Sequence, residues 1–122
     1  MTTMEELLPI EKSLWTGGPD PYRRHVDETC LLAFTKMAGV YSSDDITATV
    51  ADGPRWQELE IDVQGLVQPA ADVAMLTYRA SAIRGDEERY RALVGSGYVR
   101  RDDGWKLMYH QQTPLGEAED DA

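Results

Sequence analysis

Residues 57–67 read QELEIDVQGLV, a stretch in which polar and apolar side chains alternate. Leu59, Ile61 and Val63 fall on one face of an extended chain, whereas the acidic and amide side chains between them fall on the other. A period of two is typical of a β-strand with one buried and one solvated face. The stretch therefore predicts a long strand that begins close to residue 57.

Three further strands are expected downstream, over residues 73–83, 90–101 and 105–113. The turns between the strands are short, and residues 102–104, with the sequence DDG, form the tightest of them. Long strands joined by short turns predict an antiparallel meander in the second half of the chain.

Helical spacing dominates the first part of the chain. A helix is predicted to begin near Thr3, which has capping-box spacing to an acidic residue three positions later. Leu7 and Leu14 lie on the apolar face of this helix, and Glu11 and Lys12 are assigned to its polar face. A second short helix, a hairpin and a third helix are expected before residue 51.

Helices that precede a meander predict the α+β class, in which helices cover one face of the sheet. A length of 122 residues matches one domain, which we place at residues 1–115. Residues 116–122 are mostly acidic and are expected to form a disordered tail.

Charge restricts the partners that the chain is expected to have. The 22 acidic and 12 basic residues give a formal charge of −10, and without the four acids of the tail the charge would still be −6. An acidic surface repels phosphate backbones and anionic lipid headgroups. We therefore expect neither nucleic acid nor a membrane surface to be a partner.

The residue types that bind metals are sparse. Cys30 is the only cysteine, so no intramolecular disulfide or cysteine cluster can form, and its leucine neighbours indicate a buried thiol. The two histidines, His25 and His110, fall in different elements. We expect no metal site and no cofactor. No apolar run reaches the ~20 residues of a membrane span, and we expect a cytoplasmic protein.

Strand parity selects a set of polar side chains that are expected to face the helices. With a residue of the second helix, they would line a pocket for a small, largely apolar ligand: Tyr22, Tyr78, Ser96, Tyr98, Tyr109 and Gln111. The alternative is that these tyrosines are packing residues. A bulge in the last strand would shift the parity by one residue and exchange Tyr109 and Gln111 for His110 and Gln112.

The opposite parity places Met75, Met108 and His110 on the outer face of the sheet. A partly apolar outer face is suited to a homodimer formed sheet to sheet, with His110 hydrogen-bonded across the interface. The alternative is a solvated strand face.

Candidates for acid–base chemistry are few. The parity places no Asp or Glu on the inner face of the long strands. Asp27, after the second helix, and His25 beside it are the remaining candidates for a catalytic base. The alternative is that Asp27 is a loop or capping acid and His25 a solvated helix residue.

The end of the chain resembles a known superfamily. Residues 100–107 (RRDDGWKL) and 110–114 (HQQTP) resemble the last hairpin of the nuclear transport factor 2-like superfamily. The first loop fits the same branch of small bacterial domains, related to SnoaL-like proteins and to the association domain of calcium/calmodulin-dependent kinase, through Leu14, Trp15, Gly18, Asp20 and Tyr22. The resemblance extends over residues 4–115.

This resemblance implies a conical α+β domain in which a strongly curved antiparallel sheet wraps the helices and leaves a cavity at its wide end, with a dimer formed through the sheet. It implies no single activity, because the superfamily includes isomerases, hydrolases, dehydratases, binding proteins and oligomerisation modules. The first hypothesis is a dimeric module that binds a small apolar ligand. An acid–base enzyme acting on a small hydrophobic substrate and a pure oligomerisation module are the alternatives.

Overall fold

The computed structural model describes residues 1–116 as three helices and one six-stranded sheet. Except for Gly116, the tail expected at residues 116–122 lies outside the described residues. The elements follow in the order α1 (Thr3–Thr16), α2 (Pro19–His25), β1 (Val26–Phe34), β2 (Met37–Ser42), α3 (Ser43–Thr49), β3 (Trp56–Ala70), β4 (Val73–Arg84), β5 (Tyr90–Arg101) and β6 (Gly104–Pro114).

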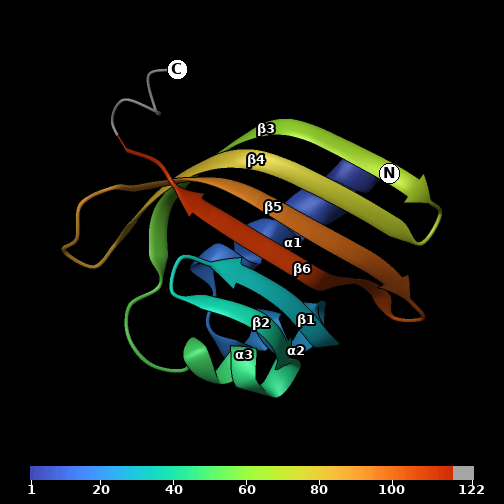
Figure 1. Cartoon of the computed structure of the whole chain (residues 1–122), viewed down its shortest axis with the longest axis horizontal. Coiled ribbons are helices and arrows are strands. Elements are labelled where there is room, and N and C mark those ends of the chain that lie inside the picture. The colour runs from blue at the N-terminus through green and yellow to red at the C-terminus, as the bar shows by residue number, and fades with distance from the viewer. Residues whose placement is uncertain (117–122) are drawn as a thin grey trace.

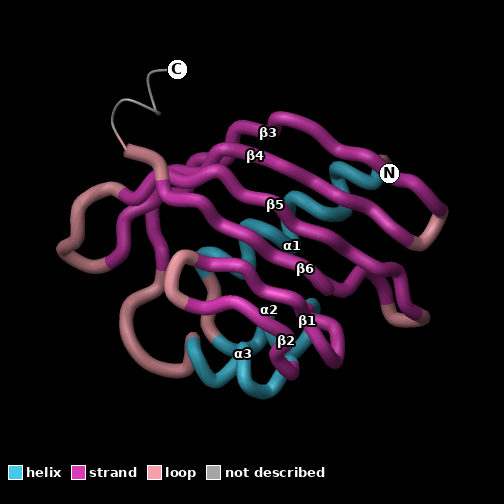
Figure 2. Tube along the Cα trace, in the orientation of Figure 1, coloured by secondary structure: helices cyan, strands magenta, loops and turns pink. Residues whose placement is uncertain are grey.

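The sheet has the strand order β2-β1-β6-β5-β4-β3. Strands β3 to β6 form the predicted antiparallel meander. Strand β1 pairs in parallel with β6, so the sheet is mixed rather than purely antiparallel. The α+β class and the curvature of the sheet are confirmed, and all three helices lie against one side of the sheet (Figure 1, Figure 2).

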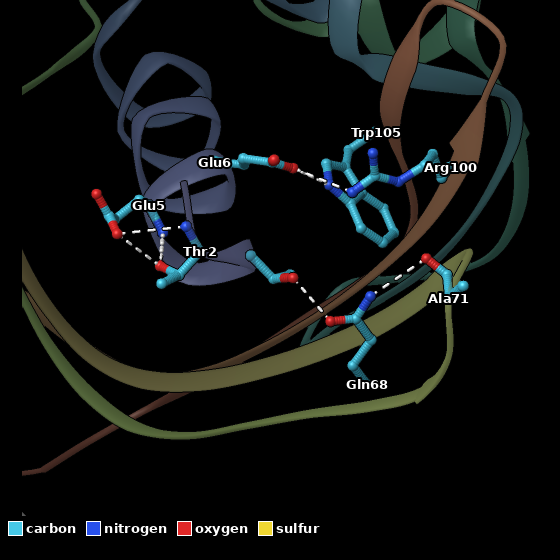
Figure 3. Close-up of polar contacts among 8 residues, drawn as sticks. Thr2, Glu5, Glu6, Gln68, Ala71, Arg100 and Trp105 are labelled. Atoms are coloured by element: carbon cyan, nitrogen blue, oxygen red, sulfur yellow. Dashed lines mark hydrogen bonds and ion pairs between the residues drawn. The ribbon is translucent and has the colours of Figure 1, made fainter.

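Helix α1 begins at Thr3, as its sequence pattern predicts, but its capping residue is different. Thr2, rather than Thr3, is the N-cap residue, and it forms a capping box with Glu5 (Figure 3). Pro9 lies inside α1 without ending it, and Gly17 caps the C-terminal end. The helix runs as one element across the inner face of the meander (Figure 1).

Three polar contacts hold the first turn of α1 against the sheet (Figure 3). The Glu6 carboxylate accepts a hydrogen bond of 2.6 Å from the Trp105 indole and pairs with Arg100 at 3.2 Å. On the other side, the Thr3 hydroxyl donates to the Gln68 side chain at 2.7 Å. These contacts fix the orientation of α1, and hence the positions of the side chains further along it.

The inner face of the sheet consists of rows of paired residues that run across the strands. One row joins Ala74, Tyr98, Leu107 and Val26, and every member is buried. The side chains of such rows pack against the apolar face of α1. Together with α1 they form two apolar clusters. The cavity described below opens at the end of the sheet where the β1–β2 turn, the α3–β3 loop and the β4–β5 loop gather (Figure 1).

Candidate functional site

Glu11 is buried on the inner face of α1, with 1% of its surface exposed. Its assignment to the polar face of the helix is therefore wrong. Glu11 follows Leu7 by one turn and precedes Trp15 by one turn, and both are buried. This spacing places it in the middle of the apolar stripe, and that position is the sequence signal that could have identified it.

Three hydroxyl groups from the sheet donate hydrogen bonds to the Glu11 carboxylate. Tyr78 of β4 and Ser96 of β5 donate to its Oε1 atom at 2.5 and 2.9 Å, and Tyr98 of β5 donates to Oε2. Burial, and then the neighbouring carboxylate, raise the pKa of both phenols. The phenols therefore stay protonated and remain donors. The Glu11 side chain thus accepts from all three hydroxyl groups.

The polar contacts continue from Ser96 to the wall of a cavity. The Ser96 hydroxyl lies 2.8 Å from His110 Nδ1, and His110 Nε2 lies 3.0 Å from the amide nitrogen of Gln112. The Tyr90 hydroxyl donates to the amide oxygen of Gln112 at 2.9 Å. His110, Gln112 and Tyr90 line the cavity, as does Glu11 at its inner end. A buried carboxylate is thus joined to cavity-lining side chains through one serine.

The cavity has a volume of about 1160 Å³ and opens to solvent. Its walls are largely apolar and aromatic. Trp56 stacks on Tyr90 with ring centroids 5.1 Å apart and meets Trp15 edge to face at 5.6 Å. Phe34 packs against the His110 ring at 5.7 Å. Desolvation by these surroundings lowers the pKa of His110, so the imidazole is neutral at physiological pH.

A second polar group lines the cavity at the C-terminal end of α1. Arg55 donates to the carbonyl oxygens of Gly17, Leu14 and Trp15 at 2.7 to 3.1 Å, and these carbonyls carry the negative end of the helix dipole. Arg55 also donates to the Tyr22 hydroxyl, which in turn donates to the Leu14 carbonyl. This arrangement holds the end of the helix, and the guanidinium contributes a positive charge to the wall.

The parity predicted for β6 is wrong beyond Met108. Gly97 pairs with Tyr109 whereas the next residue, Tyr98, pairs with Leu107, so Met108 is an extra residue that forms a bulge. From that point the alternation is shifted by one residue. His110 and Gln112 face the helices, as expected for the bulged alternative, and Tyr109 and Gln111 lie on the outer face.

The predicted pocket residues separate into three groups. Tyr22 lines the cavity. Tyr78, Ser96 and Tyr98 face inward but are fully buried around the Glu11 carboxylate, beneath the cavity wall. Tyr109 lies on the opposite face with Gln111. Its side chain and that of the exposed Met75 both lie on the side of Gly97 where a Cβ atom would point, which shows that they share this face.

The two predicted catalytic residues lie away from the cavity lining. Asp27 accepts two hydrogen bonds from Arg101, at 2.8 and 3.2 Å, and the hydrogen bond from Arg101 lowers the pKa of Asp27. Asp27 lies in strand β1, neither in a loop nor at a helix cap, and its side chain is 12% exposed. His25 ends α2, and partial burial followed by the charge of Arg24 lowers its pKa.

The predicted outer-face residues Met75 and Met108 are exposed, whereas His110 is not on that face. One row of paired residues crosses all six strands there in the order Val40, Leu31, Tyr109, Gly97, Met75 and Val67. Four of its apolar side chains are between 45% and 71% exposed. The outer face thus carries a continuous apolar row.

Residues 1–116, the part of the chain that the structure describes, lack two further features. No three His, Cys, Asp or Glu side chains in this range lie close enough together to hold a metal ion. No helix within it is long and apolar enough to cross a membrane.

Comparisons with known proteins give structural matches only. No protein-family model matches the sequence, and no curated protein matches it significantly. The structure superimposes on a nuclear transport factor 2-like protein of unknown function in nutrient uptake from Rhodospirillum rubrum, with a TM-score of 0.79 over 95% of this chain and 100% of that one, at 12% identity. The chain has the nuclear transport factor 2-like fold.

Other solved structures are also similar to this chain. A ketosteroid isomerase-like protein from Parabacteroides distasonis has a TM-score of 0.75, covering 96% of this chain and 91% of that one at 14% identity. A protein like the calcium/calmodulin-dependent kinase II association domain, from Exiguobacterium sibiricum, has a TM-score of 0.69, with 95% and 96% coverage and 16% identity. The resemblance seen in the sequence is confirmed for the nuclear transport factor 2-like fold, and an activity has to be argued from the site.

Proposed function

We propose that the chain binds a small, largely apolar molecule in the cavity between α1 and the sheet. The observation that carries this proposal is the open cavity of about 1160 Å³. Ligand pockets in proteins measure about 300–1,000 Å³ and combine apolar walls with a few convergent polar groups. This cavity has the same character, with Trp15 and Trp56 on its walls and the polar groups of His110 and Gln112 on one side.

Binding can be measured with N-phenyl-1-naphthylamine, a neutral apolar dye that fluoresces when it leaves water. We expect saturable binding at one site per chain. Met37→Trp, in the cavity lining, should weaken binding about tenfold or more, because the larger ring fills space that the dye needs.

Met108→Trp is the matched control, because it makes the same substitution on the outer face, and it should bind the dye as the wild type does. Absence of saturable binding, or equal weakening in both variants, would contradict the proposal. A chain that binds nothing in the cavity would favour the pure oligomerisation module instead.

We also propose that two copies associate through the outer face of the sheet. The apolar row across all six strands supports this, because exposed apolar side chains that form one continuous surface are typical of protein interfaces. Light scattering at micromolar concentration should give the mass of a dimer, and Leu31→Glu combined with Met75→Glu should give a monomer. A monomeric wild-type protein would refute this part of the proposal.

An acid–base enzyme is the second candidate, and one observation favours it. His110 is a neutral imidazole on the wall of an apolar cavity, held by neighbours at both ring nitrogens. Such a group suits proton abstraction from carbon next to a carbonyl. The test is deuterium uptake by 2-tetralone in heavy water. Uptake that is faster with the wild type than with His110→Gln would support the enzyme, and equal rates would exclude His110 as its base.

A further inference from the structure

Glu11 is the end point of a chain of hydrogen bonds that starts at the cavity wall. The chain runs from Tyr90 through Gln112, His110 and Ser96 to the carboxylate, with distances of 2.8 to 3.0 Å at each step. Hydrogen bonds have a direction, and the direction of this chain can be worked out from groups that can only donate or only accept.

The direction is fixed first at Tyr78. The indole N–H of Trp15 can only donate, and it lies 2.8 Å from the Tyr78 oxygen. The Tyr78 proton is therefore free to point at Glu11 Oε1. Ser96 donates to the same carboxylate oxygen, which accepts from both hydroxyl groups. The single proton of the Ser96 hydroxyl is thereby committed to Glu11.

Because the Ser96 proton is used in the hydrogen bond to Glu11, the tautomer of His110 is determined. Ser96 has no second proton, so its oxygen can only accept from His110, and Nδ1 must carry a hydrogen. In the neutral ring Nε2 then holds a lone pair. This nitrogen faces the amide nitrogen of Gln112, which is a donor, so the orientation of the amide agrees with the same direction.

The hydrogen-bond chain ends at the cavity wall with Gln112 and Tyr90. The amide oxygen of Gln112 accepts from the Tyr90 hydroxyl, whose proton is used in that bond. In the described part of the chain, this leaves a lone pair on the Tyr90 oxygen and a second one on the Gln112 oxygen. The cavity wall therefore offers acceptors to a ligand that can donate a hydrogen bond.

We propose that Glu11, acting through Ser96, fixes the direction of this hydrogen-bond chain and thereby selects ligands that carry a hydroxyl group on an apolar, aromatic-sized body. Glu11 and Ser96 are positioning residues, since neither need touch the ligand. The inference rests on the proposed binding function for its ligand, whereas the tautomer of His110 is a property of the free protein. The two parts can therefore be tested separately.

The tautomer is measured by nitrogen-15 NMR of the imidazole rings in the free protein. His25 and His110 are the only histidines, so His25→Gln assigns the signals. We expect the Nδ1–H form for His110 in the wild type. In Ser96→Ala the Nδ1–H form should lose its preference, because its acceptor is gone. Ser96→Thr keeps a hydroxyl and should keep the wild-type tautomer.

An Nε2–H ring in the wild type, or an unchanged tautomer in Ser96→Ala, would overturn the proposed direction. Thermal unfolding shows whether each variant folds. The readout is informative because a serine that only fills space would not change the tautomer of a neighbouring ring when it is replaced.

Ligand selection is measured with 2-naphthol and 2-methoxynaphthalene as competitors of the dye. The two share one aromatic body, and only 2-naphthol can donate a hydrogen bond. We expect 2-naphthol to bind about three- to tenfold more tightly, the effect of one net hydrogen bond. In Ser96→Ala this ratio should fall towards about one, as the direction of the chain is released.

Equal affinity of the two compounds for the wild type would overturn the proposed selectivity, as would an unchanged ratio in Ser96→Ala. If neither the dye nor the naphthalenes bind, the cavity-binding function fails, and the proposed ligand selectivity fails with it. The NMR result then still decides whether Ser96 sets the direction of the hydrogen-bond chain. Failure of the function and failure of the inference are thus distinguishable.

Discussion

Replacing Glu11 by leucine tests whether the buried carboxylate stabilises the fold. The substitution removes the acceptor of three buried hydroxyl groups. Ser96 can turn its proton to His110 Nδ1, whereas the hydroxyl protons of Tyr78 and Tyr98 are left without an acceptor. Each buried donor left unsatisfied costs about 1–3 kcal/mol, so we expect Glu11→Leu to lower the free energy of unfolding by about 2–6 kcal/mol.

A double-mutant cycle with Tyr98→Phe separates this hydrogen bond from the others. The only polar partner of the Tyr98 hydroxyl in the described residues is Glu11. Tyr98→Phe alone should cost about 1.5–3 kcal/mol, as expected for a hydrogen bond to a charged group. In the Glu11→Leu background the same change should be close to neutral or stabilising, because it removes an unsatisfied hydroxyl. The coupling energy should therefore be about 1.5–3 kcal/mol or more.

Urea unfolding followed by tryptophan fluorescence is the assay, because Trp15 and Trp105 are buried and report loss of the core. Glu60→Leu is the control: this carboxylate is exposed on β3, and its loss should change stability by about 0.5 kcal/mol or less. A Glu11→Leu protein as stable as the wild type would refute the reasoning. It would mean that removing a desolvated carboxylate offsets the loss of all three hydrogen bonds.

Three further predictions concern groups whose pKa the fold changes. Burial raises the pKa of the Cys30 thiol to about 12, so the folded protein should react with a disulfide reagent far more slowly than the same protein in urea. His110 is neutral when folded, and the unfolded chain binds a proton below its ordinary pKa of 6.5. The free energy of unfolding should therefore fall as the pH drops below 6.5, and less steeply in His110→Gln, as measured by urea unfolding. Asp27 has a pKa below its ordinary 3.8, so the stabilisation by Arg101 should be complete at neutral pH and be lost as the pH falls below 3.8; Asp27→Asn should flatten that part of the acid unfolding curve.

The fold could be predicted from sequence because its strands are long and their period is clear. Four strands of 11 to 15 residues alternate over enough positions to define their faces, and short turns fix their neighbours. The parallel contact of β1 with β6 has no comparable signal. It joins segments about 80 residues apart, and nothing local to either strand specifies a parallel partner.

The site was predicted only in part, and for two physical reasons. The charge of Glu11 favours the outside of α1, whereas its spacing from Leu7 places it inside. A charged residue is uncommon on the apolar face of a helix, so its residue type predicts a solvated position even where the helical spacing predicts a buried one. The second reason is the bulge at Met108, which reverses the faces of the last residues of β6. A bulge depends on how two strands pair, and neither strand alone encodes it.

The two departures from regular patterning converge on one place in the molecule. The acid on the apolar face of α1 and the extra residue in β6 lie in different elements, yet Ser96 bonds both to Glu11 and to His110, which the bulge turns inward. Burying a carboxylate is costly, and a bulge interrupts the strand pairing. If these features were incidental, nothing would require them to meet within hydrogen-bond distance beside the cavity. Their convergence is therefore the strongest structural argument that this region does more than fill the core, since violations of local rules that share one location are expected at functional sites.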